Sequence, residues 1–239
     1  MKKLVFSVLI FCVVSGGIFA QRTYNSDNAE KRNVSGFHGI NVGTGIELVI
    51  MEGNVEEVAV SASKPEFRDK IVTKVENGIL KIHYENKLSA PNTKKERKSL
   101  KAWVSYKLLD QLDANTGAQV RIEGTLKSSS LKLKANTGAE VTGTISTDDL
   151  TVDQSTGSVI NLSGTASKLD IEGSTGSLFK GVDLKTNTCY AKVSTGAGIT
   201  VTAEKELNVK ANTGGYVKYK GEASIREITK NTGGSVSKI

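Results

Sequence analysis

The stretch Leu133-Lys134-Ala135-Asn136-Thr137-Gly138-Ala139-Glu140-Val141 decides the fold of this chain, because its pattern occurs seven times. Each copy centres on a triplet of Asn or Ser, then Thr, then Gly. Successive triplet glycines are separated by 21, 19, 19, 20, 18 and 19 residues. A spacing of about 20 residues is typical of a solenoid, in which each repeat forms one turn. The glycines are Gly117, Gly138, Gly157, Gly176, Gly196, Gly214 and Gly233.

Apolar residues flank every triplet at fixed offsets. The residue three positions before the Asn or Ser is apolar in every copy, and so is the residue three positions after the Gly. Polar residues alternate with the first set, which is the period of two that β-strands require. Each repeat therefore predicts two half-buried strands around a sharp corner, and stacked repeats share one apolar core. The glycine supplies the positive φ that such a corner needs.

The residues before the repeat predict further strands. Residues 34–107 alternate in short apolar pieces, and Asn77-Gly78 between two of them is typical of a tight hairpin. Residues 108–239 hold the seven repeats. The expected fold is therefore all-β, a parallel β-solenoid of short repeats preceded by an N-terminal β-rich region. Only six residues follow Gly233, so the last rung is short and its strand edge needs cover from the chain or from a partner.

The start of the chain has the pattern of a signal peptide. Residues 1–20 contain a cationic start, an apolar run and a small-residue stretch ending at Ala20, and residues 21–33 form a polar leader. Removal of residues 1–20 takes Cys12 away and leaves Cys189 without a disulfide partner. We expect no membrane span in the mature chain, since no apolar run approaches the roughly 18 residues required. The predicted location is the periplasm, the outer surface or the medium.

The charge of the chain gives little support to nucleic-acid binding. The formal net charge is +7, and only six of the 32 basic residues are Arg. Arg supplies the forked hydrogen bonds that phosphates and guanines favour, and no basic stripe is interleaved with aromatic residues. We therefore expect no nucleic-acid partner, and glycans or envelope components remain the possible partners.

The segment Phe37-His38-Gly39-Ile40-Asn41-Val42 resembles the opening of the putative auto-transporter adhesin, head GIN domain family, whose naming motif is Gly-Ile-Asn. The order of the following segments is also similar to that family. They are residues 46–50, residues 77–82, and residues 106–109 leading into the first triplet. The resemblance implies an exported, envelope-associated protein of Bacteroidetes-like bacteria with a right-handed parallel β-helix. It brings no catalytic residues and no cofactor.

Aromatic and acidic side chains on outward positions are the candidate site residues. Tyr190, Tyr216 and Trp103 could stack on sugar rings, although Trp103 is favoured as a cap over the first rung. Asp153, Asp170 and Glu172 could hold a calcium ion, as in β-helix polysaccharide lyases. Their simpler interpretation is a solvated face with ion pairs between rungs, Lys134 with Asp153 and Glu172 with Lys192.

Two further residue sets have structural interpretations. Cys189 occupies a column of leucines and is expected to be a buried core residue and not a nucleophile. The stacked threonines of the triplets are expected to bond within their corners, although similar arrays bind ice in other solenoids.

The sequence favours a non-enzymatic, exported adhesin-like binding protein with an unknown ligand. A calcium-dependent polysaccharide lyase and a purely structural envelope protein are the alternatives. No nucleophile elbow of a hydrolase and no phosphate-binding loop is present. Gly43-Thr44-Gly45 resembles the start of a dinucleotide-binding fingerprint but lacks its third glycine.

Overall fold

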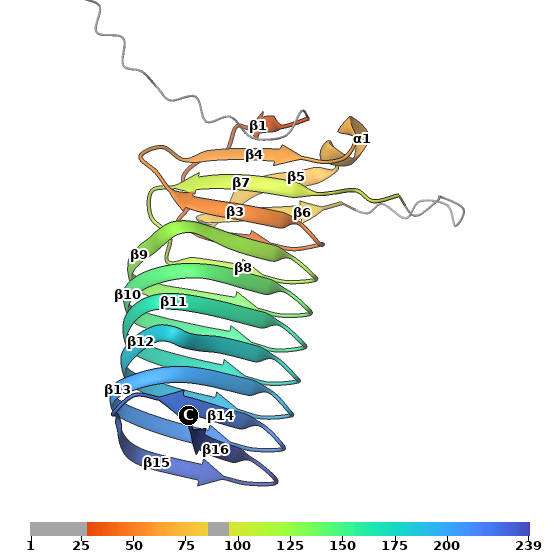
Figure 1. Cartoon of the computed structure of the whole chain (residues 1–239). Helices are drawn as coiled ribbons and strands as arrows, with labels where there is room; N and C mark the ends of the chain where they lie inside the picture. Colours follow the sequence, from red (N-terminus) through yellow and green to blue (C-terminus); the bar gives the residue numbers. More distant parts are fainter. Residues whose placement is uncertain (1–27, 86–95) are drawn as a thin grey trace, which may run out of the picture.

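The computed structural model describes residues 28–85 and 96–239 as one stack of β-rungs (Figure 1). The expected signal peptide, Cys12 and most of the polar leader lie outside these residues. The strands are β1 (Glu30–Arg32), β2 (Gly39–Val42), β3 (Glu47–Glu52), β4 (Glu57–Ser61), β5 (Ile71–Glu76), β6 (Ile79–Tyr84), β7 (Lys101–Tyr106), β8 (Gln111–Ala114), β9 (Gln119–Ala135), β10 (Glu140–Gln154), β11 (Val159–Gly173), β12 (Leu178–Val193), β13 (Gly198–Ala211), β14 (Tyr216–Lys220), β15 (Ser224–Lys230) and β16 (Ser235–Lys238).

The predicted β-solenoid is confirmed. Strands β9 to β13 each run from one triplet corner to the next, and each pairs in parallel with the equivalent strand of the next rung. Midway along, each of these strands turns back on itself, so a rung has two sides joined by a corner at one edge and a bend at the other (Figure 1). The bend was not evident from the repeat, because no single turn motif recurs there, although strand pairing is interrupted at it, as between Thr147 and Asp149.

The corners have left-handed backbone at two consecutive residues. Each triplet glycine has a φ between +67° and +77°, and the Thr before it has a φ between +43° and +52°. The glycine amide donates to the carbonyl oxygen of the Thr in the following rung, as Gly138 does to Thr156 at 2.9 Å. These bonds continue strand pairing through the corners, which explains why the turn is repeated in every rung. The β-branched Thr is unexpected in this conformation.

The parallel stack continues into the N-terminal region, across the boundary expected at residues 107–108. Strand β2 pairs in parallel with β8, and β3 pairs in parallel with β9. Gly43-Thr44-Gly45 forms an additional corner, in which Thr44 has a φ of +56° and Gly45 donates to the carbonyl oxygen of Thr116 at 3.0 Å. The signal was in the sequence, since apolar Ile40 and Leu48 stand three residues before and after this triplet.

The motif Gly39-Ile40-Asn41 has a structural role at the start of the stack. A Cβ on Gly39 would lie 2.4 Å from Cδ1 of Ile79 and 3.1 Å from Cβ of Gln111, so a larger residue here would push against side chains of both neighbouring strands. Ile40 is fully buried in the core. The Asn41 side chain accepts a hydrogen bond from Asn115 at 3.3 Å, which begins the Asn and Ser column beside the corners.

An inserted segment closes the N-terminal end. Strands β6 and β7 pair in parallel with β2 and β3, and antiparallel strands then cover them, β5 on β6 and β4 on β7. Asn77 and Gly78, with φ of +52° and +75°, form the hairpin between β5 and β6. Strand β1 pairs antiparallel with β4, and the short helix α1 (Pro65–Arg68) lies beside β4. Antiparallel pairing here ends the parallel stack.

The core lies between the two sides of the rungs. The two expected columns of apolar residues, one before and one after the triplets, are both buried except in the last rung. Every residue of the first column as far as Val209, and of the second as far as Val217, is exposed by 3% or less. In the last rung Val236 is only partly covered and Ile228 is 36% exposed. No helix among residues 28–85 and 96–239 is long and apolar enough to cross a membrane.

Candidate functional site

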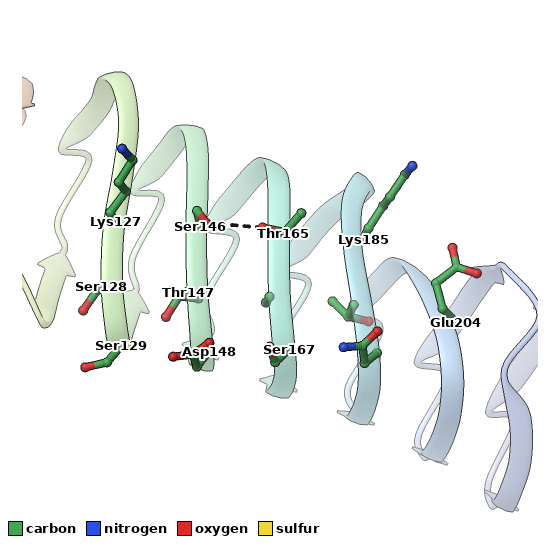
Figure 2. A pocket seen from close by; sticks show the side chains of 13 residues that line it. Lys127, Ser128, Ser129, Ser146, Thr147, Asp148, Thr165, Ser167, Lys185 and Glu204 are labelled. Carbon is green, nitrogen blue, oxygen red and sulfur yellow. Dashed lines mark hydrogen bonds between the residues drawn. The ribbon is translucent and has the colours of Figure 1, made fainter.

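A polar groove runs along the bends, on the edge of the solenoid opposite the corners. Its volume is about 720 Å³, and five successive rungs contribute to it (Figure 2). We call it the bend groove. It is lined by Lys127, Ser128, Ser129, Ser146, Thr147, Asp148, Thr165, Ala166, Ser167, Lys185, Thr186, Asn187 and Glu204.

Small side chains form the floor of the bend groove. Thr147, Ala166 and Thr186 are buried and lie in register on three neighbouring strands. The hydroxyl of Thr147 donates to the backbone carbonyl of Asp149 at 3.2 Å, and that of Thr186 donates to the carbonyl of Thr202 at 2.8 Å. The floor hydroxyls therefore hold the bend in shape, and their small volume leaves the hollow.

Two rows of exposed side chains form the walls (Figure 2). Neighbouring members of a row are close enough to interact, since the Thr165 hydroxyl donates to Ser146 at 3.4 Å. Strand spacing of about 4.8 Å gives the five rungs an axial length of about 19 Å. One wall contains Lys127, Ser146, Thr165 and Lys185, the other contains Ser129, Asp148, Ser167 and Asn187, and Glu204 on the fifth rung stands at the end of the groove.

A second hollow extends this edge toward the last rung. It has a volume of about 440 Å³ and shares Lys185 and Glu204 with the bend groove. Its other lining residues include Asp183, Lys220 and Lys238. The bend edge therefore presents polar groups of both charges over most of the parallel stack.

The bend groove offers hydrogen-bond donors and acceptors at regular axial intervals and no catalytic constellation. Hydroxyl, amide, ammonium and carboxylate groups all line it, whereas a nucleophile paired with an oriented base is missing from its lining. Among the described residues, no group of three or more His, Cys, Asp or Glu side chains could hold a metal ion. This chemistry suits the binding of an extended polar ligand.

The three aromatic candidates are not brought together, and none of them lines the bend groove. Tyr190 lies on β12 with 39% exposure, and Lys168 lies 5.6 Å from the centre of its ring. Tyr216 lies on β14, and its ring covers Gly198, where an added Cβ would be 2.3 Å from Cζ of the tyrosine. The two tyrosines occupy opposite sides of the rungs, so they cannot contact the same short ligand.

Trp103 does not cover the end of the core. It alternates on β7 with Ala102 and Val104, which are both fully buried, so its half-buried ring lies on the outer face of the sheet. The expected cap over the first rung is supplied by backbone pairing of β4 with β7. The sequence could not indicate this, because β4 is brought there by a chain reversal.

The acidic candidates lie on one outer face, and one of them is paired with a lysine. Asp153 and Glu172 are register neighbours, and Asp170 lies two residues before Glu172. Glu172 forms the expected ion pair with Lys192 at 2.8 Å. The other expected pair, between the described residues Lys134 and Asp153, is not formed, although the two are register partners. The hydrogen bond that Lys192 donates to the Glu172 carboxylate raises the pKa of Lys192 above its ordinary value. A carboxylate held by a lysine is a poorer calcium ligand, and the calcium site stays a prediction.

Cys189 is a buried core residue. It is fully buried in register with Leu169 and Leu207. Burial, and secondarily the charge of Asp170, raises the pKa of its thiol to about 12. At neutral pH the side chain is an uncharged thiol with no access to solvent, unlike a reactive cysteine.

The corner edge carries the Asn and Ser column and the Thr column side by side. The Asn and Ser side chains bond along the stack, as Ser155 does to Asn136 at 2.8 Å. The triplet threonines are exposed, and corner bonds of their hydroxyls are present at Thr116 and Thr156, each at 3.3 Å. The first column stabilises the stack, and the second forms one exposed row.

Comparison with solved structures shows that about nine-tenths of this chain shares its fold with known proteins. A putative adhesin from Bacteroides fragilis superposes with a TM-score of 0.76 at 20% identity, covering 90% of this chain and 98% of that one. A putative adhesin from Parabacteroides merdae gives 0.70 at 13% identity, with coverages of 89% and 95%. A structure from Parabacteroides distasonis named putative lipid binding protein gives 0.66 at 19% identity, with coverages of 89% and 97%.

Sequence comparison gives the family. No curated protein matches the chain. The family described as putative auto-transporter adhesin, head GIN domain, matches residues 36–223, from before β2 to after β14. The chain therefore belongs to the putative auto-transporter adhesin, head GIN domain family.

Proposed function

We propose that the protein is an exported, non-catalytic binding protein whose bend groove holds an extended polar polymer, most simply a polysaccharide, along the solenoid axis. The observation that carries the proposal is the alignment of polar side chains from five successive rungs in one groove. A polymer with a regular repeat of hydroxyl groups could contact several rungs at once. Such contacts add along the chain, so weak individual bonds suffice.

The lining of the groove is matched to sugars more than to apolar ligands. Its floor consists of Thr and Ala side chains, and its walls offer hydroxyl, amide and charged groups. Lys127 and Lys185 stand three rungs apart on the same wall, which suits a polymer that carries spaced acidic groups. One similar structure is named a putative lipid binding protein, and lipid vesicles therefore belong among the ligands to be tested.

Binding should be measured against a panel of immobilised polysaccharides, the envelope polysaccharide of the producing cell and anionic lipid vesicles. Thr165→Trp and Ser167→Trp would narrow the groove from its two walls, and both residues are exposed. Thr151→Trp is the matched control, because Thr151 is exposed on an outer face away from the groove. We expect the two groove variants to lose at least about tenfold in affinity, and the control to lose little.

Charge reversal provides a second comparison. Lys127→Glu with Lys185→Glu should weaken binding of an acidic polysaccharide. Lys134→Glu with Lys210→Glu changes the net charge of the protein by the same amount, but on an outer face of the rungs away from the groove. Equal losses in the two double variants would show that net charge and not the groove determines binding. The binding function would be refuted if no polysaccharide or vesicle of the panel bound the protein and no partner were recovered with it from the cell envelope.

Export and absence of catalysis need separate tests. A tagged copy should fractionate outside the cytoplasm of the producing cell, as the pattern of residues 1–20 predicts. Any polysaccharide that binds should be recovered uncleaved, with and without calcium. Calcium-dependent cleavage that Asp153→Asn abolishes would instead support the lyase alternative.

A further inference from the structure

The last rung leaves both sides of the solenoid with an open strand edge. Within residues 28–85 and 96–239, β15 pairs with β13 alone and β16 pairs with β14 alone. Both strands lie at the end of the stack farthest from β1 (Figure 1). An open edge presents unpaired backbone donors and acceptors that can pair with another strand.

Apolar side chains are uncovered at this end. Ile225 and Ile228 of β15 lie in register with Leu207 and Val209, which are buried at 0% and 1% exposure. The two isoleucines are themselves 46% and 36% exposed. Register shifts between Leu207 and Asn208, so Arg226 is the extra residue of a bulge and both isoleucines extend the inner columns. They are core residues that lack a following rung.

Strand β15 is complementary to itself in the antiparallel direction. Its central stretch is Ser224-Ile225-Arg226-Glu227-Ile228-Thr229, which has similar or opposite-charge residues at positions equally far from its centre. We propose that β15 pairs with β15 of a second copy, forming a closed tail-to-tail dimer. In this dimer, Ser224 of one copy lies opposite Thr229 of the other, Ile225 lies opposite Ile228, and Arg226 lies opposite Glu227. By symmetry each of these pairs occurs twice.

This register is selected among its neighbours by charge and by apolar contact. A shift of the centre onto Arg226 or Glu227 would place like charges opposite each other and an isoleucine opposite a charged residue, and both are unfavourable. In the proposed register four isoleucines from the two copies meet and continue the core. Each arginine also gains a carboxylate on the other copy, beside its present partner Glu206 at 3.5 Å.

The opposite end of the molecule favours a dimer over a filament. A head-to-tail stack that continued the parallel pairing of the rungs would need an open edge of a parallel strand at the N-terminal end. That end is covered by antiparallel β4 on β7 and β5 on β6, with the three-residue β1 outside β4. An antiparallel contact of β15 with itself is satisfied by two copies.

The oligomeric state tests the proposal through charge reversal. The wild-type protein should be measured by light scattering and analytical ultracentrifugation up to about 1 mM. Arg226→Glu places Glu opposite Glu227, and Glu227→Arg places Arg opposite Arg226, so each single variant should raise the dissociation constant by about tenfold or more. The double variant R226E/E227R restores opposite charges and should recover the dimer.

A mixture of the two single variants gives the sharpest result. Arg226→Glu and Glu227→Arg are each self-repelling, whereas the pair is complementary at both charged positions, so the equimolar mixture should form a one-to-one dimer. Arg121→Glu and Glu123→Arg are the matched controls, since these residues form an exposed pair at 3.0 Å in the middle of the stack. Far-UV circular dichroism and thermal unfolding check that all variants fold.

Three outcomes would overturn the proposal. They are a wild-type protein that stays monomeric over the whole range, a dimer that ignores both reversals, and filaments that grow with concentration. A mixture that fails to associate, while the wild type does, would refute the register. Failure of polymer binding in the bend groove leaves this test unaffected, because β15 does not line that groove.

Discussion

Replacing Gly164 with Ala should destabilise the protein much more than replacing Gly157 with Ala, although both glycines have positive φ. Their φ angles are +107° and +67°. A Cβ added at Gly164 would lie 2.0 Å from the carbonyl oxygen of Ile145 on the preceding rung, whereas one added at Gly157 would meet no atom within 4 Å. The two variants therefore separate backbone strain from close approach between rungs.

The magnitudes follow from these contacts. At Gly157 a left-handed Ala costs about 1–2 kcal/mol, and the reduced entropy of the unfolded chain offsets about 0.4–1 kcal/mol, so we expect a loss of about 1 kcal/mol. At Gly164 the Ile145 carbonyl must also retreat from 2.0 Å to at least the 3.4 Å of an ordinary contact. This disturbs about three neighbouring strand hydrogen bonds of about 1 kcal/mol each, so with the cost of the left-handed Ala the total loss should be about 4 kcal/mol.

Thermal unfolding followed by circular dichroism measures the difference. For a chain of this size a loss of 3 kcal/mol corresponds to a fall in Tm of about 6–12 °C between the two variants. Hydrogen exchange should show the loss of protection at Gly164→Ala concentrated in β10 and β11, which pair through Ile145 and Gly164. Equal losses in the two variants would refute the reasoning, because they would show that rung spacing adapts to the added Cβ.

Three further predictions concern single side chains. Gln154 is 3% exposed, and neither polar atom of its side chain has a hydrogen-bond partner among the described residues. Gln154→Met should therefore raise the free energy of unfolding by about 1–3 kcal/mol. A decrease in the free energy of unfolding would instead show that a buried water satisfies the amide. Thr156 has a φ of +50°, which Asn tolerates better, so Thr156→Asn should raise stability by up to about 1 kcal/mol in denaturant unfolding, whereas Thr156→Val should not. Burial raises the pKa of Cys189 to about 12, above its value near 9 in the unfolded chain, so its contribution to stability is complete below pH 9 and is lost as the pH rises toward 12. Relative to Cys189→Ala, the wild type should lose about 1.4 kcal/mol per pH unit in that window, and the native thiol should resist alkylation until the protein unfolds; rapid labelling at neutral pH would contradict the buried assignment.

Much of the fold could be predicted because the repeat encodes it locally. A strand needs alternation, a corner needs a residue that accepts positive φ, and both recur within every 20 residues or so. The same pattern placed Cys189 in the core, where it lies between Leu169 and Leu207. The extra corner at Gly43-Thr44-Gly45 was missed because its first residue is Gly, although its apolar flanks match.

The N-terminal end could not be predicted, because its order along the stack differs from its order in the chain. Strands β6 and β7 follow β3 in sequence but lie outside β2 and β3 in the stack. Alternation identifies such strands without saying which edge each one joins. For the same reason Trp103 was expected to cover the core, whereas β4 does so by backbone pairing.

The candidate site shows the same division. The aromatic and acidic side chains chosen from the sequence are outward residues outside the bend groove. Tyr190 shares one outer face with the acidic residues, as the register partner of Asp170, whereas Tyr216 lies on the opposite side of the rungs. A weak signal for the groove existed in the small residues Ser128, Thr147, Ala166 and Thr186, each eight positions before a triplet. Such a column has no distinctive chemistry until neighbouring rungs form its walls.

The sequence by itself determined the repeating corner, the apolar columns and hence the β-solenoid, because these depend on contacts between neighbouring copies of one local pattern. Only the tertiary structure decided where the strands turn back, which polar side chains share a groove, and how the two ends differ. Those features depend on residues far apart in the chain and on the edge that each strand joins. The open edge of β15 is one such feature. The sequence pattern places its isoleucines in the apolar columns of the core, whereas in the structure they are partly exposed because β15 pairs on one side only.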